Sequence, residues 1–107
     1  MLVRRELVEN DEFVAKARDL FGSTYVADIA LEAVKHYLSA EPDLLKKQTT
    51  VGRTKRFGPI FGFKTNAVPA FPAVVVYFAA SNPPHTIYLL DIERAEDDGD
   101  TLRRDDI

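Results

Sequence analysis

The 107-residue chain contains no cysteine. This absence excludes disulfide bonds and cysteine-ligated zinc, and it is compatible with a reducing compartment such as the cytosol. No apolar run approaches the roughly 18 residues of a membrane span, and Arg4, Arg5, Glu6 and Glu9 stand where a signal peptide would have its apolar core. We therefore expect a cytoplasmic protein without a membrane partner, with residues 1–107 forming a single domain of ordinary size.

Familiar catalytic and metal-binding motifs are also missing. The chain has no glycine-rich phosphate loop, no His-Glu-x-x-His motif, no serine–histidine–aspartate arrangement and no metal-ligand spacing. The stretch Asp97-Asp98-Gly99-Asp100 lacks the later glutamate of a calcium loop, so we interpret it as part of a solvated acidic tail that starts near residue 96. We expect neither a metal nor a small-molecule cofactor.

The charge is low overall but unevenly distributed. The formal net charge is −3, yet the segment from Lys46 to Lys64 holds six basic residues and no acidic one. A local basic segment suits contact with a phosphate backbone, whatever the total charge. The alternative is a solvated loop whose charge serves solubility only.

The segment from Pro72 to Arg94 predicts a β-hairpin. An apolar run over residues 73–80 is followed by the turn formers Ser81-Asn82-Pro83-Pro84 and by a second run over residues 86–92. Valine, isoleucine, tyrosine and phenylalanine are typical of strands. Because the first run is apolar at successive positions, it belongs inside a sheet that has a helical layer on at least one side.

Two helices are predicted before this hairpin. Asn10 or Asp11 can cap the first, which carries apolar residues at helical spacing, and Gly22 is suited to end it. Ser23 can cap the second, which Pro42 brings to an end because the residue before a proline disfavours helical geometry. Its apolar stripe comprises Val26, Ile29, Ala30, Ala33, Val34, Tyr37 and Leu38.

The remaining segments give weaker signals. Leu2–Val8 is a candidate first strand, and the alternation over Thr54–Phe57 suits another strand, which Gly58-Pro59 interrupts. Residues 60–71 fit either a strand or a loop. We expect an α+β domain with an N-terminal strand, a two-helix hairpin and an antiparallel sheet of about three further strands, with the helices on one face.

These segments, taken with their residues, resemble the RelE/HigB-type toxins of bacterial toxin–antitoxin pairs. The resemblance covers most of the chain, and its most specific parts are the basic Gly52-x-x-Lys55-Arg56-Phe57 and the last strand, Ile87-Tyr88-Leu89-Leu90-Asp91-Ile92. The Phe13–Leu20 helix, Tyr37-Leu38 followed by Pro42, and the Val74–Phe78 strand also look like the family's pattern.

The resemblance implies a ribosome-associated endoribonuclease, an mRNA interferase, whose partners are mRNA on the ribosome and a cognate antitoxin. Arg53, Lys55 and Arg56 match the family's basic strand, and Arg94 matches the basic residue after the last strand with a register uncertain by one. Val74 stands where the family's central strand begins with arginine, and residues 63–69 replace the family's glycine- and lysine-rich turn. The loss of that arginine bears on catalysis more than on the fold.

RNA cleavage of this type needs a base for the 2′-hydroxyl, an acid for the leaving 5′-oxygen and cations for the phosphorane. Lys55 can serve as base only if the neighbouring cations favour its neutral form, whereas Arg53, Arg56 and Arg94 would stabilise charge. For RNA binding we select Lys46, Lys47, Lys64 and Tyr88. The alternative for the catalytic set is contact with solvent or with an acidic antitoxin segment only.

Other polar side chains favour structural roles. His36 should lie beside the core stripe of the second helix, and His85 should be an exposed turn residue. Tyr77 and Tyr88 are candidates for stacking on a base, although strand tyrosines usually pack half-buried. Asp91 should lie on an exposed sheet face or pair with one of the three basic residues at positions 53, 55 and 56.

Two other functions remain open at this level. The protein could be a non-catalytic relative that keeps the fold as a protein-binding module and offers a sheet edge to a partner. It could also be an α+β domain unrelated to these toxins.

Overall fold

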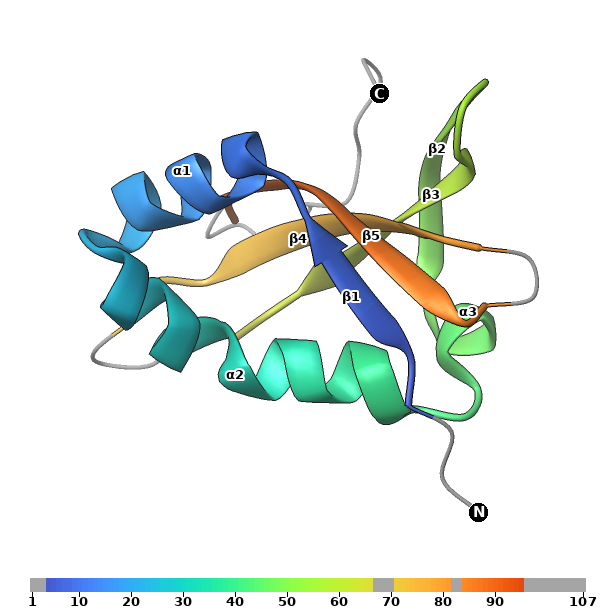
Figure 1. Ribbon diagram of the computed structural model, residues 1–107, viewed down its shortest axis with the longest axis horizontal. Coiled ribbons are helices and arrows are strands. Elements are labelled where there is room, and N and C mark those ends of the chain that lie inside the picture. The colour runs from blue at the N-terminus through green and yellow to red at the C-terminus, as the bar shows by residue number, and fades with distance from the viewer. Residues whose placement is uncertain (1–3, 67–70, 82–83, 96–107) are drawn as a thin grey trace.

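A computed structural model describes residues 4–66, 71–81 and 84–95 of the chain. The elements in chain order are β1 (Glu6–Glu9), α1 (Asp11–Phe21), α2 (Thr24–Ala40), α3 (Leu44–Lys47), β2 (Thr49–Thr54), β3 (Gly58–Lys64), β4 (Val74–Ala80) and β5 (Thr86–Arg94). Figure 1 shows the helix pair α1–α2 lying across one side of the sheet. Among these residues, no helix is both long enough and apolar enough to cross a membrane.

The described strands form one five-stranded sheet in the order β1-β5-β4-β3-β2. The predicted α+β class, the helix pair and the antiparallel β4–β5 hairpin are confirmed. The details of the prediction need correction, because four strands follow the helices and β1 pairs with β5 in parallel, so that the sheet is mixed. Parallel pairing requires a long crossover, which the helices and the intervening strands supply.

Both predicted helix starts are confirmed by their caps. The Asn10 side chain accepts a hydrogen bond from the Phe13 backbone N–H at 2.7 Å, and the Ser23 hydroxyl accepts one from the Val26 N–H at 3.0 Å. The first helix ends at Gly22, whose φ of 91° is left-handed and whose N–H donates to the Arg18 carbonyl. These local bonds satisfy backbone groups that a helix end leaves free.

The main core lies between the helix pair and the sheet. The buried stripe of α2 consists of Ala27, Leu31, Val34 and Leu38. The predicted stripe is therefore right only at Val34 and Leu38, and Ile29, which it included, is 44% exposed. The buried stripe packs with Phe13 and Ala17 of α1 against buried residues of the central strands, namely Val74, Val76, Phe78, Ile87, Leu89 and Ile92. The prediction that β4 is covered by a helical layer is therefore confirmed.

The opposite face of the sheet, which we call the helix-free face, is also partly covered. Val75, Tyr77 and Ala79 of β4 are at most 2% exposed there and cluster with Ile60 and Ala95. The residues packed against this cluster include Val51 and Phe57 of the β2–β3 hairpin. The hairpin therefore bends over the helix-free face, as the steep rise of β2 and β3 in Figure 1 illustrates.

The boundary of the basic strand differs from the prediction. β2 ends at Thr54, so Lys55, Arg56 and Phe57 form the turn, and Gly58 and Pro59 begin β3 instead of interrupting a strand. Gly58 has a φ of 72°, a conformation that a residue with a side chain rarely adopts. β3 also settles part of the ambiguous segment 60–71 as a strand. The predicted Leu2–Val8 strand begins too early, since β1 starts only at Glu6. The acidic tail from residue 96 lies outside the described residues.

Candidate nucleic-acid interface

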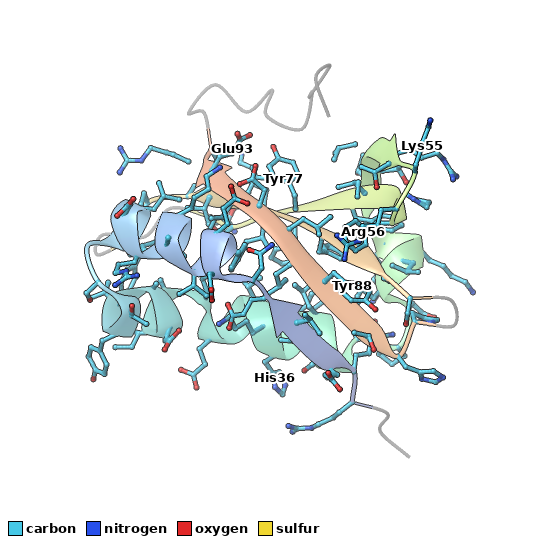
Figure 2. All side chains as sticks on the ribbon, turned by 45° about the horizontal axis from the view of Figure 1, so that its top comes forward. His36, Lys55, Arg56, Tyr77, Tyr88 and Glu93 are labelled. Atoms are coloured by element: carbon cyan, nitrogen blue, oxygen red, sulfur yellow. The ribbon has the colours of Figure 1, made fainter. Side chains whose placement is uncertain are left out.

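Three of the four predicted catalytic residues lie together on the β2–β3 hairpin. Arg53 is exposed near the end of β2, and Lys55 and Arg56 are exposed in the turn. A Cβ placed on Gly58 would lie 3.9 Å from the Arg53 guanidinium nitrogen Nη1, so that side chain folds toward the turn. We call Arg53, Lys55 and Arg56 the hairpin cations; in Figure 2, Lys55 marks the tip and Arg56 lies on the side of Tyr88.

Aromatic rings adjoin these cations. The Arg56 guanidinium carbon lies 5.0 Å from the centroid of the Phe57 ring, and that ring lies 5.4 Å from the Tyr88 ring at an interplanar angle of 44°. A cavity of about 420 Å³ is lined by Arg56, Phe57, Ala80, Ser81 and Tyr88. We call it the aromatic pocket. Cations beside stacked rings are the usual means of holding single-stranded nucleic acid, because each base offers a π-face.

Local sequence explains how a turn residue reaches Tyr88 two strands away. The Thr54 hydroxyl accepts a hydrogen bond from the Phe57 backbone N–H at 3.0 Å, which fixes the turn, and Gly58 permits its positive φ. The register of β2 shifts between Thr50 and Gly52, and such irregularities increase the twist of a hairpin. The twisted hairpin carries the Phe57 ring across β4.

Arg94, the fourth predicted catalytic residue, lies at the other end of the sheet. It pairs with Val74 at the start of β4, whereas Tyr88 pairs with Ala79 near its end. Arg94 lies six positions after Tyr88 on β5, which corresponds to about 20 Å along a strand. Arg94 lines a different cavity, beside Lys16 and Leu20 of α1. The structure does not bring it to the hairpin cations.

The lysines predicted to bind RNA are spread over the molecule. Lys46 is exposed on α3. Lys47 on the same helix forms an ion pair with Glu41, with 3.0 Å between its Nζ and the carboxylate Oε1. That hydrogen bond is the main reason why the pKa of Glu41 lies below its ordinary 4.5 and the pKa of Lys47 lies above its ordinary 10.5. Lys64 lines a cavity of about 360 Å³ on the helix-covered side, away from the aromatic pocket.

Asp91 has a partner that the sequence did not indicate. Its carboxylate Oδ1 lies 2.5 Å from the Nζ of Lys16 on α1, and both side chains are partly exposed. Of the two alternatives predicted for Asp91, the pair with Arg53, Lys55 or Arg56 does not form, because β5 places Asp91 beside α1 rather than beside the hairpin turn.

The histidines take no part in the aromatic pocket. His85 is exposed in the β4–β5 turn as predicted. His36 is exposed on α2, where it points away from the sheet (Figure 2). Both lie on the periphery of the described structure.

Two residues near this face were not given a role from the sequence. Phe57 was part of the basic motif, and its place directly after Arg56 was the only signal that it could contribute a ring. Glu93 accepts a hydrogen bond from the buried Tyr77 hydroxyl on the helix-free face, and nothing in its local sequence indicates this contact. The roles of Phe57 and Glu93 both depend on contacts with residues distant in sequence.

The described residues hold no group of three or more histidine, cysteine, aspartate or glutamate side chains able to bind a metal ion. The hairpin cations and the aromatic pocket bring positive charge and two aromatic rings together on one surface. Comparisons of the chain with protein-family models, with curated proteins and with solved structures find no match.

Proposed function

We propose that this protein binds single-stranded RNA through the hairpin cations and the aromatic pocket, and that it acts as a toxin of the RelE/HigB type that cleaves mRNA on the ribosome. The observation that carries the proposal is the contact of Arg56 with Phe57 and of Phe57 with Tyr88 beside Lys55. Cations meet the phosphates and rings stack on unpaired bases. An antitoxin that covers the hairpin would hold such an enzyme inactive.

Cleavage is assigned to the hairpin cations, with Lys55 nearest the tip. Arginine remains protonated at neutral pH, so Arg53 and Arg56 would stabilise the negative charge of the phosphorane. The position of Arg94, about 20 Å from Tyr88 along β5 at the usual rise per residue, means that it would contact another part of the RNA rather than the same phosphate. The same position favours the second candidate, a non-catalytic protein of this fold that binds RNA or an acidic partner protein without cutting.

Binding is tested by the salt dependence of affinity for a fluorescent single-stranded RNA. Lys55→Gln should weaken binding and lower the slope of log affinity against log salt by about 0.7, the value for one phosphate contact on a single strand. Arg18→Gln is the matched control, since Arg18 is an exposed cation on α1. Equal slopes for the two variants and the unmodified protein would refute the hairpin as the RNA site.

Cleavage is tested by inducing the protein in bacteria while following growth and mRNA integrity. The toxin proposal expects growth arrest and cut messages, both lost in Lys55→Gln. Normal growth and intact messages in the presence of soluble protein would refute the enzyme. If RNA is nevertheless bound in vitro through Lys55, the non-catalytic candidate is favoured.

A further inference from the structure

We propose that the aromatic pocket selects guanine, with Arg56 as the residue that determines this specificity. The inference rests on the proposed function, because it names the base that the RNA-binding surface takes. Three features carry it: the position of Arg56 at the pocket, the available donors of its guanidinium, and the rings on which a base can stack.

Of the three hairpin cations, Arg56 is the one that lines the aromatic pocket. Its guanidinium carbon lies 5.0 Å from the centroid of the Phe57 ring, and stacking on a ring limits the orientations of a guanidinium. The turn that carries both residues is fixed by the hydrogen bond from the Phe57 N–H to the Thr54 hydroxyl. In Figure 2, Arg56 lies between Lys55 and Tyr88. The guanidinium is therefore held at the pocket.

The N–H groups of the Arg56 guanidinium are available to a ligand. Within the part of the chain that the structure describes, this side chain joins no ion pair and donates no hydrogen bond to the protein. Arginine presents its N–H donors in a planar fork and accepts no hydrogen bond. Two parallel N–H groups suffice to bind a base, so the others remain for a phosphate, as the proposed cleavage requires.

A fork that only donates hydrogen bonds distinguishes guanine from the other bases. Guanine presents two neighbouring acceptors, N7 and O6, whereas adenine presents one acceptor and one donor on the same edge. On the corresponding edge, uracil has the single acceptor O4 and cytosine has a donor. The bases of a single strand are unstacked and can offer these edges to a protein. Bidentate binding of arginine to N7 and O6 of guanine is the commonest base-specific contact in protein–DNA complexes.

The other walls of the aromatic pocket suit one flat base. The Phe57 and Tyr88 rings lie 5.4 Å apart at an interplanar angle of 44° and provide π-faces for stacking. On the side of the β4–β5 turn, the Ser81 hydroxyl accepts hydrogen bonds from the backbone N–H groups of His85 at 3.1 Å and Thr86 at 3.0 Å, which fix that wall. The volume of about 420 Å³ lies in the lower part of the range for small-molecule sites, about 300–1,000 Å³.

The first experiment measures the preference by fluorescence anisotropy, with uridine oligonucleotides that differ at one central position. The oligonucleotide with guanine should bind about tenfold more tightly than those with adenine, cytosine or uracil, near the lower end of what one bidentate contact distinguishes. Replacing this guanine with 7-deazaguanine, which lacks the N7 acceptor, should remove most of the preference. Hypoxanthine, the base of inosine, keeps N7 and O6 and should retain it. Equal affinities for all bases, a preference for another base, or full retention by 7-deazaguanine would overturn the proposal.

The second experiment assigns the preference to Arg56. Arg56→Lys keeps the positive charge but replaces the planar fork with a point charge. The ratio of affinities for guanine and adenine should fall from about ten to below about three, whatever the change in overall affinity. Lys55→Gln is the matched control, because Lys55 belongs to the same turn but does not line the aromatic pocket. It should weaken the binding of every oligonucleotide by a similar factor and leave the ratio unchanged. An unchanged ratio in Arg56→Lys, or an equal fall in both variants, would overturn the assignment.

The results separate this inference from the proposed function. If all oligonucleotides bind alike and Lys55→Gln weakens each of them, the hairpin binds RNA and guanine selection is wrong. If Lys55→Gln changes no affinity while Arg56→Lys removes a guanine preference, base selection stands and the phosphate contact of Lys55 is wrong. If no oligonucleotide binds, both proposals fail.

Discussion

The packing of Phe57 on Tyr88 is the contact on which the aromatic pocket depends, and its energy can be predicted. The two rings lie 5.4 Å apart in a tilted arrangement, and such pairs contribute about 0.5–1.5 kcal/mol beyond the burial of their area. Half-burial of the Phe57 side chain adds about 1 kcal/mol. Phe57→Ala should therefore lower the free energy of unfolding by about 2 kcal/mol.

The measurement is urea unfolding followed by circular dichroism, with linear extrapolation to water. Tyr25→Ala is the control, because Tyr25 is 75% exposed on α2 and its removal should change the free energy by no more than about 0.5 kcal/mol. The cycle of Phe57→Leu, Tyr88→Leu and the double variant isolates the ring pair, with an expected coupling of about 0.5–1.5 kcal/mol.

A coupling of zero would refute this reasoning. It would mean that the β2–β3 hairpin does not hold Phe57 over β5, and the aromatic pocket would then not exist as a formed site. The same conclusion would follow if Phe57→Ala lowered the free energy of unfolding no more than Tyr25→Ala does. RNA affinity provides an independent check, since loss of the Phe57 ring should weaken binding even at high salt, where phosphate contacts are screened.

Two further predictions concern the helices. Asn10→Ala should lower the free energy of unfolding by about 1 kcal/mol, because it removes the cap on α1. Asn10→Asp should retain most of the stability that the cap contributes, and urea unfolding of both variants tests this. Because the folded pKa of Glu41 is lowered, its pair with Lys47 contributes stability above the ordinary pKa of 4.5 and loses it as the pH falls through the folded value. Glu41→Gln should therefore show a smaller decrease in melting temperature on acidification than the unmodified protein, and an equal decrease would contradict the assigned pair.

Local signals predicted the ends of α1 and α2 correctly, but not the buried face of α2. Asn10, Gly22 and Ser23 act on backbone groups within four residues, so their effect can be read from the adjacent sequence. The same holds for the β4–β5 hairpin, whose two runs flank one short turn. Parallel pairing of β1 with β5 joins Glu6 to Thr86, and no local pattern encodes a partner so distant along the chain.

The candidate site was predictable only in part, for the same reason. Lys55 and Arg56 are adjacent in the sequence and therefore lie together in the structure. The alternation over Thr54–Phe57 was too short to distinguish a strand from the turn that these residues form. The contact of Phe57 with Tyr88 and the separation of Arg94 from the hairpin both depend on the register of β3, β4 and β5. A change of register by one residue would place each side chain on the other face.

The register of β4 also buries position 74, which limits the side chains that can replace Val74. Val74 is 1% exposed among the core residues beneath the helices, so the arginine that the RelE/HigB pattern has at this point would not reach the hairpin cations. Val74→Arg should lower the free energy of unfolding by on the order of 3–5 kcal/mol, the usual effect of an uncompensated buried charge. The cavity beside Val74 gives a guanidinium one route outward, but Lys64 lines that cavity and repels it.

Thr50→Arg is the matched control, because it adds the same charge at an exposed position of β2 and should leave stability within about 0.5 kcal/mol. Urea unfolding and RNA cleavage are measured for both variants, and neither should cut RNA faster than the unmodified protein. A stable Val74→Arg variant with enhanced cleavage would show that position 74 faces the RNA, which would contradict the register of β4. Without that result, an arginine at position 74 has no part in the cleavage that we propose.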